Sequence, residues 1–299
     1  MAVAEVVEAV VPRGRARAAL VAMRPRQWTK NLLLFAGILF AAELGDEVRW
    51  LEATAAFLAY CAASSAAYLV NDVRDADVDR LHPVKRNRPI ARGELPVPAA
   101  LGLAGCLAAL ALGVAAALNP WSLALMGAFL AVQAAYTGGV KHVVLVDVLA
   151  IAGLFVIRAA AGAEAVQVPI SPWLLLCTAL LALFLGLAKR RAELVRVNDE
   201  ATVGRPVLDG YSLPLVDQLV TIVAGSTVIA YALYTFEGRD SRAMMATIPF
   251  VLLGVFRYLL LMHRRDLGEE PEEVFLRDAP LAATVAAWAL ACALILVAT

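Results

Sequence analysis

The densest group of polar side chains in this 299-residue chain lies between residues 71 and 79. If that segment is helical, Asp72, Asp75 and Asp79 stand at offsets of zero, three and seven residues, which places them within about 60° of one another on one face. Three carboxylates so close repel each other beside an apolar medium and require a compensating cation. Oxygen ligands suit Mg²⁺, which commonly takes one or two carboxylates together with substrate phosphates. The spacing predicts a magnesium site formed by these three residues, which are also the candidate catalytic residues.

The same segment could instead be a solvated helix end that carries charges without a function. Two observations favour a site. The segment ends an apolar stretch, where ionisable side chains are costly and usually functional, and Asn71 adds a neutral oxygen beside the carboxylates. Asp77 falls on another face of the helix, and we expect no role for it.

Basic side chains follow the acidic segment directly. Lys85, Arg86 and Arg88 lie in the run 85–93. Arginine forms bidentate contacts with phosphate and lysine supplies a point charge, so the pairing of acids with bases predicts a polyanionic substrate. The alternative is that these are ordinary loop charges on the cytoplasmic side of a membrane. We favour phosphate contact, above all for Arg86 and Arg88.

A second group of candidate substrate-binding residues is spread over later segments. Arg158 lies within an apolar stretch, where an unpaired guanidinium costs several kcal/mol, so we expect a buried anion beside it, either a carboxylate or a phosphate. Lys189 and Glu193 lie four positions apart on one helix face. Instead of binding substrate, they could form an ordinary surface ion pair. Arg257 is also within an apolar segment, but nothing directs it to the site. The group comprises Tyr136, Lys141, Arg158, Lys189, Arg190, Glu193 and Tyr211.

The elements that must position these residues are membrane-spanning helices. The chain is 62% hydrophobic and 17% charged, whereas soluble domains carry roughly 45–50% apolar and about 25% charged residues. Strands are not expected, because the apolar runs are continuous rather than alternating, and only helices and closed barrels satisfy their backbone groups in lipid. At about 20 residues a span, the sequence predicts nine: 28–44, 52–70, 98–117, 120–138, 143–163, 172–189, 215–236, 243–262 and 280–298. The first is short and requires Trp28 in the headgroup region and a helix start near Gln27.

Lysine and arginine are distributed unevenly between the connections. The amino-terminal tail and every second connection between spans lie on one side of the membrane and together hold 21 of the 26 basic residues. Such an excess marks the cytoplasmic side. These connections are 71–97, 139–142, 188–214 and 263–279. The amino terminus and the long loops 71–97 and 188–214 are therefore expected in the cytoplasm, where the chemistry belongs. We expect a basic tail over residues 1–27 and one catalytic domain of nine helices over residues 28–299.

Other classes of site find little support. The formal net charge is zero, so no nucleic-acid partner is predicted. The four cysteines stand singly in apolar runs and the three histidines share no ligand spacing. No cleavable signal is expected, because the basic tail leads directly into an apolar segment. The sequence leaves open whether several copies assemble.

The acidic motif after the second predicted span resembles that of the UbiA-type intramembrane prenyltransferase superfamily. Within it, the chain is similar to the decaprenyl-phosphate phosphoribosyltransferases over about residues 20–298. The motifs that carry the similarity are the segments 24–31, 85–93, 141–148, 155–159 and 189–194.

The resemblance implies transfer of a 5-phosphoribosyl group from phosphoribosyl pyrophosphate to decaprenyl (polyprenyl) phosphate, with Mg²⁺ as cofactor and release of pyrophosphate. It implies an enzyme of the cell (inner) membrane with a cytoplasmic active site, substrate contact for Lys30, and a product used as a lipid-linked arabinose precursor for the cell wall. One departure stands out. The superfamily carries a second Asp-rich motif after the sixth span, and residues 189–199 contain no such pair. Glu193 is considered as a substitute for that motif, and the basic residues there would instead fit contact with an additional phosphate.

Two alternatives have different sequence signatures. A transferase that joins a polyprenyl diphosphate to an aromatic acceptor would share the first motif, but the missing second motif and the surplus of basic residues disfavour it. A transporter or scaffold would be expected to show repeat symmetry with broken helices in matching halves, and none is detected.

Overall fold

The structure, a computed structural model, describes residues 13–40, 45–82, 84–200, 206–237, 242–264, 274 and 277–298. Every regular element in those ranges is a helix, which confirms the all-α prediction. The α-helices are α1 (Arg15–Ala22), α2 (Ala36–Phe40), α3 (Glu47–Arg74), α4 (Ala76–Leu81), α5 (Val97–Leu118), α6 (Pro120–Gly138), α7 (Val146–Ala165), α8 (Pro172–Glu200), α9 (Leu213–Glu237), α10 (Ile248–Arg264) and α12 (Ala279–Ala298). The 3₁₀ helices are η1 (Pro25–Phe35), η2 (Lys85–Asn87), η3 (Val140–His142), η4 (Pro206–Gly210) and η5 (Arg242–Thr247).

Six of the described helices are long and apolar enough to cross a bilayer, where the sequence predicts nine spans. The first predicted span differs most. It is a 3₁₀ helix from Pro25 to Phe35, and only Ala36–Phe40 is α-helical before residues 41–44, which lie outside the described residues. The helical segment does begin near Gln27, at Pro25, but it is not an α-helix before Ala36. The indole of Trp28 donates to Ser65 Oγ at 3.0 Å, and Ser65 in turn donates to Met23 O, so side-chain bonds to α3 hold this segment.

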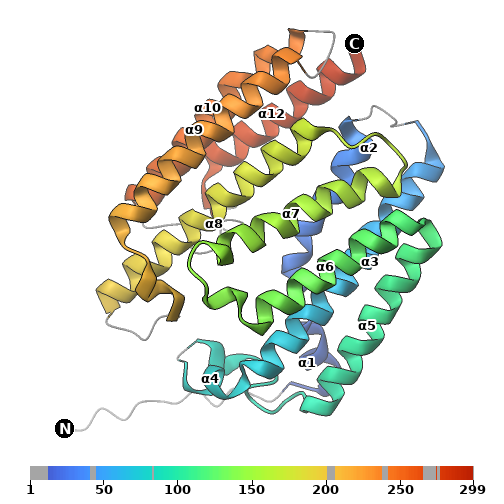
Figure 1. Ribbon diagram of the computed structural model, residues 1–299, viewed down its shortest axis with the longest axis vertical. Helices are drawn as coiled ribbons and strands as arrows, with labels where there is room; N and C mark the ends of the chain where they lie inside the picture. Colours follow the sequence, from blue (N-terminus) through green and yellow to red (C-terminus); the bar gives the residue numbers. More distant parts are fainter. Residues whose placement is uncertain are drawn as a thin grey trace. The chain divides into compact units, whose positions relative to one another are not determined.

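Residues 1–31 and 58–114 form one compact unit, and residues 32–57 with 115–299 form a second. In the first unit, the helices α1, α3 and α5 (Figure 1) share a core to which α1 contributes the small residues Ala18 and Ala22. Alanine at the contacts lets the backbones approach closely, as in other membrane helix pairs. This packing fixes the end of α3, where the acidic segment lies.

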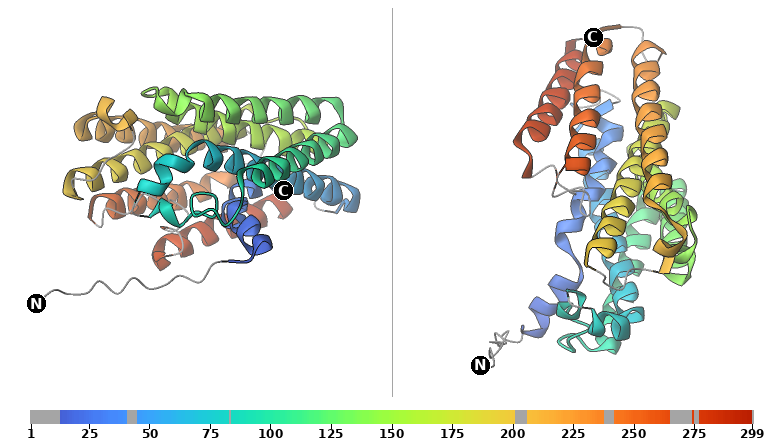
Figure 2. Two further views of the ribbon diagram at one scale, coloured as in Figure 1. Left: turned by 90° about the horizontal axis from the view of Figure 1, so that it is seen from below. Right: turned by 90° about the vertical axis from the view of Figure 1, so that its left-hand side faces the viewer.

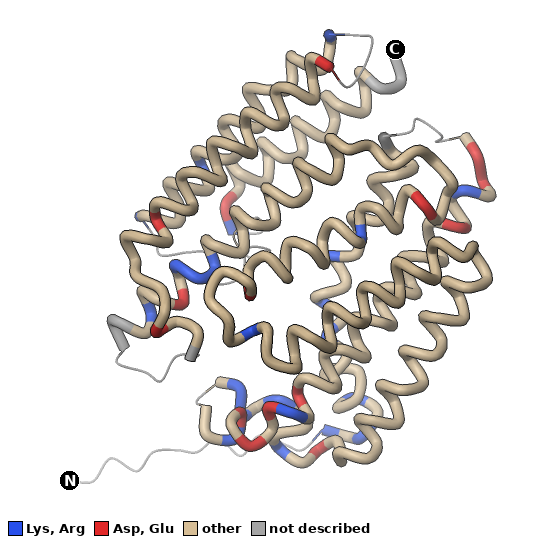
Figure 3. Tube along the Cα trace, in the orientation of Figure 1, with Lys and Arg blue, Asp and Glu red and all other residues tan. Residues whose placement is uncertain are grey.

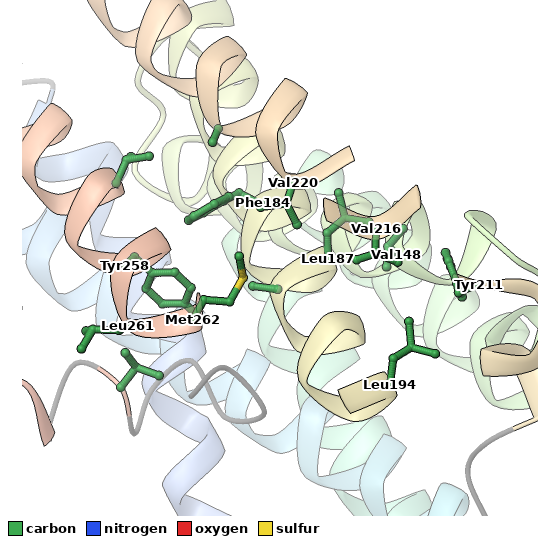
Figure 4. Packing of buried hydrophobic residues seen from close by; sticks show 14 of the residues in the cluster. Val148, Phe184, Leu187, Leu194, Tyr211, Val216, Val220, Tyr258, Leu261 and Met262 are labelled. Atoms are coloured by element: carbon green, nitrogen blue, oxygen red, sulfur yellow. The ribbon is translucent and has the colours of Figure 1, made fainter. Parts of the chain in front are cut away.

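In the second unit, consecutive helices are neighbours from α6 through α10, and α12 lies along α10 (Figure 2). From α7 onward, their buried residues form one apolar core. Figure 4 shows Phe184 of α8 beside Tyr258 of α10, with ring centroids 5.3 Å apart. The same core includes Val148 at the start of α7 and Leu194 near the end of α8, so it holds the polar ends of these helices in place.

A close backbone contact locks α7 in the second unit. A Cβ atom on Gly162 would lie 2.1 Å from the carbonyl oxygen of Leu34, and one on Gly37 would lie 2.7 Å from Ala163 Cα. Only glycine permits backbones to meet at this distance.

The intramembrane Arg257 has a structural partner. Its Nε and Nη2 atoms contact the two carboxylate oxygens of Asp278 at 3.0 and 2.8 Å. Asp278 also accepts from Leu281 N at the start of α12. The pair joins α10 to α12 and requires no substrate.

Candidate active site

The acidic segment keeps a nearly continuous helical path across the junction of α3 and α4. Asp75 N donates to Asn71 O and Asp79 N donates to Asp75 O at 2.9 and 2.8 Å. Asp72 and Asp79 are consequently turned to one side and buried. The side chain of Asp77 is 92% exposed and pairs with Arg80, which confirms that Asp77 faces elsewhere.

Two arginines bind the buried carboxylates. Arg24 Nη2 lies 2.5 Å and Arg88 Nη1 lies 3.1 Å from Asp72 Oδ1. The same Arg88 nitrogen lies 2.6 Å from Asp79 Oδ2. Figure 3 shows the charged segments of this unit gathered around α4 and the chain on either side of it. Two carboxylates and two guanidiniums thus form one compact network, named here the Asp72 cluster.

Asp75 is partly exposed and accepts a hydrogen bond from Asn71 Nδ2 at 3.1 Å. Within the described ranges, no three side chains of His, Cys, Asp or Glu are gathered so as to hold a metal ion, so the predicted grouping of Asp72, Asp75 and Asp79 around one ion is not formed. The arrangement fits a smaller donor set, because oxygens of Asp72 and Asp79 converge on one cationic nitrogen. Two carboxylates completed by substrate phosphates are a usual Mg²⁺ environment.

Arg24 is a member of the cluster that the sequence interpretation did not assign to the site. Its backbone φ is +54°, an uncommon value for a residue with a side chain. Its guanidinium lies 4.8 Å from the ring centroid of Tyr68, a cation–π distance. Such strain persists only where surrounding contacts enforce it, and it is common at functional sites. In the sequence, the signal for Arg24 was its position as the first residue of the motif 24–31.

The other predicted phosphate-binding residues of this unit lie nearby in sequence but are more open. Lys85 and Arg86 begin η2, where Lys85 is partly exposed and Arg86 exposed. The ring nitrogen Nδ1 of His82 accepts from Lys85 N at 3.3 Å, which orients the turn. Lys30, in η1, is partly exposed.

The second unit contains its own buried network, formed where α7, α8 and the segment after η4 meet. Arg190 Nε donates to Asp147 Oδ2 at 2.6 Å, and Arg190 Nη1 contacts Glu193. Tyr211 Oη donates to Asp147 Oδ1 at 2.7 Å. Asp147 is fully buried. We call these four residues the Asp147 cluster; it unites three predicted residues with one, Asp147, that had no predicted role.

Asp147 could have been singled out, because a carboxylate that opens an apolar span is usually functional. Tyr211 also stabilises the turn that precedes Asp147. Leu145 N donates to the phenolic oxygen at 2.7 Å, and Leu145 adopts a φ of +66°. Burial, followed by the bond to Asp147, raises the pKa of Tyr211 to about 12. The phenol therefore remains protonated and acts as a donor at neutral pH.

Three further predicted residues belong to this unit. Tyr136, near the end of α6, is close enough to Arg190 for an electrostatic interaction. Lys141 is part of η3 and Lys189 precedes Arg190 in α8, and both are partly exposed. Lys141 and Lys189 are therefore partly exposed basic groups, and Tyr136 is a partly exposed phenol, in the same unit as the buried network.

Arg158 is placed apart from the Asp147 cluster. It lies 11 residues beyond Asp147 on α7, which at the helical rise is about 16 Å along the axis. Its guanidinium lies 4.7 Å from the ring centroid of Phe129 and 5.3 Å from that of Phe155, and it donates to Leu154 O. Aromatic faces thus solvate this charge, a partner that the sequence interpretation did not consider.

Residues 32–277 match the family model described as the UbiA prenyltransferase family. The chain is 35% identical over 293 residues to a decaprenyl-phosphate phosphoribosyltransferase from Mycolicibacterium smegmatis, covering 93% of this chain and 92% of the relative. A protein of the same name from Mycobacterium tuberculosis is 38% identical over 277 residues, covering 89% and 90%.

The fold is also found in a UbiA homolog from Archaeoglobus fulgidus, solved bound to GPP and Mg²⁺. The two share 19% identity and a TM-score of 0.72 over 94% of this chain and 100% of that one. The chain therefore belongs to the UbiA prenyltransferase family and has its fold. It is a multi-pass membrane protein and a transferase.

Proposed function

We propose that this protein transfers the 5-phosphoribosyl group of phosphoribosyl pyrophosphate to decaprenyl phosphate and releases pyrophosphate. The observation that carries the proposal is sequence identity of 35–38% over about nine-tenths of both chains to proteins of that activity's name. The Asp72 cluster supports it independently, since paired guanidiniums beside buried carboxylates suit a substrate with several phosphates.

In the proposed reaction, an oxygen of the lipid phosphate bonds to C1 of the ribose while the C1–O bond to pyrophosphate breaks. Pyrophosphate leaves with the bonding electron pair. A phosphate monoester has a second pKa near 6, so the acceptor is already an anionic nucleophile and needs no general base. As in other glycosyl transfers, positive charge develops on the sugar.

The residues of the Asp72 cluster serve the leaving group. Mg²⁺ held by Asp72 and Asp79, with Asp75 and Asn71 beside them, would neutralise charge on the departing pyrophosphate. Arg24 and Arg88 are placed to bind phosphate oxygens and to orient the donor. This is catalysis by position and electrostatics rather than by a covalent intermediate.

The Asp147 cluster has a different proposed part. Arg190 is paired with two carboxylates and is almost wholly buried, unlike Arg24 and Arg88, so Arg190 and Glu193 are proposed to fix the helix ends and to hold Tyr211 in place. Phosphate contact falls to the accessible side chains beside them, Lys141 and Lys189, with Tyr136. Lys30, Lys85 and Arg86 are proposed to do the same in the first unit, and Arg158 remains a proposed substrate contact through its positive charge alone.

The proposed location is the inner membrane with the site facing the cytoplasm, from the bias of basic residues. We further propose that the product serves as a lipid-linked arabinose precursor for the cell wall. The lipid bilayer is the proposed environment of the acceptor.

The test uses purified protein in lipid nanodiscs with ribose-labelled phosphoribosyl pyrophosphate, decaprenyl phosphate and either Mg²⁺ or EDTA. We expect lipid-extractable label only with Mg²⁺. Asp72→Asn should reduce it at least about a hundredfold, the loss typical for a key electrostatic group. The matched control Asp77→Asn removes an exposed carboxylate five residues away and should retain activity.

Equal activity of the two variants would refute the proposed site. A parallel reaction with a polyprenyl diphosphate and an aromatic acid tests the alternative transferase. Labelled prenylated aromatic product, with none from phosphoribosyl pyrophosphate, would replace the proposed function with that alternative.

A further inference from the structure

One nitrogen atom joins the two buried carboxylates of the Asp72 cluster. Arg88 Nη1 lies within hydrogen-bonding distance of both Asp72 Oδ1 and Asp79 Oδ2, at 3.1 and 2.6 Å. It therefore occupies the point toward which the oxygens of a two-carboxylate metal site converge. A divalent ion bound by these same oxygens would compete with the guanidinium for their lone pairs.

The Asp147 cluster offers an internal comparison. Arg190 also joins two carboxylates, but its side chain is 1% exposed and lies beside the apolar core, whereas that of Arg88 is 25% exposed. Removing Arg190 from its carboxylates would leave buried charges unpaired, which is strongly unfavourable. Arg88 lies outside the helices, directly after η2, and can turn toward water or a ligand. One arginine is fixed and the other can be exchanged.

We propose that Arg88 and a divalent cation exchange at Asp72 and Asp79. Without metal, Arg88 keeps the carboxylates together. When metal and a diphosphate group bind, Arg88 leaves the carboxylates and binds a phosphate oxygen. The inference deepens the proposed function and rests on it only in that the ligand contains a diphosphate. Arg88 is thus a positioning residue first and a ligand-binding residue afterwards.

Charge balance gives this exchange a direction. The two carboxylates of the cluster are neutralised by Arg24 and Arg88. A divalent ion alone would place two further positive charges beside two guanidiniums, so it binds weakly. A diphosphate offsets that charge and gives the released arginine a bidentate partner. Metal and diphosphate must therefore strengthen each other's binding, by the same factor in both directions.

The experiment measures Mn²⁺ binding to the full-length protein in nanodiscs by electron paramagnetic resonance of the free ion, with and without inorganic pyrophosphate. Arg88→Gln removes the competing charge but keeps a hydrogen-bond donor. We expect Mn²⁺ alone to bind this variant about tenfold more tightly than wild type. Pyrophosphate should then tighten Mn²⁺ binding less than it does in wild type.

Arg80→Gln is the matched control, because Arg80 is a nearby arginine that pairs with the exposed Asp77. Mn²⁺ affinity in Arg80→Gln should stay within about twofold of wild type. The exchange is overturned if Mn²⁺ binds Arg88→Gln no more tightly than Arg80→Gln while both variants keep the wild-type thermal transition.

If Arg88→Gln does not fold, Arg88→Lys provides the test. A lysine ammonium can approach the carboxylates but gives no bidentate phosphate contact. Pyrophosphate should therefore tighten Mn²⁺ binding less in Arg88→Lys than in wild type, and equal tightening overturns the exchange. The metal measurements need no turnover. If wild-type protein shows no transfer activity, the proposed reaction alone is refuted. If Arg88→Gln binds Mn²⁺ with the wild-type affinity, the exchange alone is refuted.

Discussion

Neutralising Asp147 should destabilise the fold more than neutralising a carboxylate at the surface. Asp147 is fully buried and accepts from Arg190 at 2.6 Å and from Tyr211 at 2.7 Å. In Asp147→Asn the amide cannot compensate the guanidinium, which remains in a low-dielectric environment with Glu193 alone. Breaking a buried ion pair in this way costs about 3–5 kcal/mol.

The matched variant is Asp217→Asn. Asp217, on α9, places Oδ1 2.7 Å from Nε of Arg191, the residue after Arg190 on α8, but the Asp217 side chain is 39% exposed. Water can replace that contact, so its loss should cost about 1 kcal/mol or less. Reversible unfolding of both proteins in mixed micelles with increasing dodecyl sulfate, followed by circular dichroism, gives the two free energies. Equal losses would show that Asp147 is not the charge that holds this junction.

Two further predictions concern close packing and pH. Gly162→Ala places a methyl group 2.1 Å from Leu34 O and should lower the free energy of unfolding by about 1–3 kcal/mol or more. Gly153→Ala, on the same helix, adds a methyl group in open space and should leave the stability unchanged. Equal stability of the two variants in the same unfolding titration would contradict the contact. The raised pKa of Tyr211, about 12, means that its stabilising effect is complete below pH 10 and is lost as the pH rises through 12. The melting temperature of wild type should fall toward that of Tyr211→Phe only above pH 10, and a convergence between pH 7 and 9 would contradict the assignment.

The sequence interpretation succeeded where a local pattern determines the outcome. Helical periodicity correctly placed Asp72 and Asp79 on one face and Asp77 on another, because the path of the chain through the α3–α4 junction stays nearly helical. It also predicted Asp75 beside them, but Asp75 accepts a hydrogen bond from Asn71 and is partly exposed. It failed for the first span. Hydropathy does not distinguish an α-helix from a 3₁₀ helix. The 3₁₀ segment is held by the hydrogen bond from Trp28 to Ser65 and by the bond from Ser65 to Met23 O.

Partners of charged residues were the harder problem. The sequence indicated that Arg158 and Arg257 need compensation, since a guanidinium in an apolar segment is costly. It could not say that Phe129 and Phe155 surround the first and that Asp278 pairs with the second. Phe129 and Asp278 come from other helices or loops than their arginines, and hydropathy does not show which helices meet.

Composition and the periodicity of apolar and acidic residues determined by themselves that this chain is a helical membrane protein with a polar site at the end of its second long apolar segment. Both properties depend on short-range regularities that every helix shares. Only the tertiary structure decided which cations meet which carboxylates: Arg24 and Arg88 at Asp72, and Arg190 at Asp147. Electrostatic attraction acts between any such pair, but distance and burial, which packing sets, select the pairs that form.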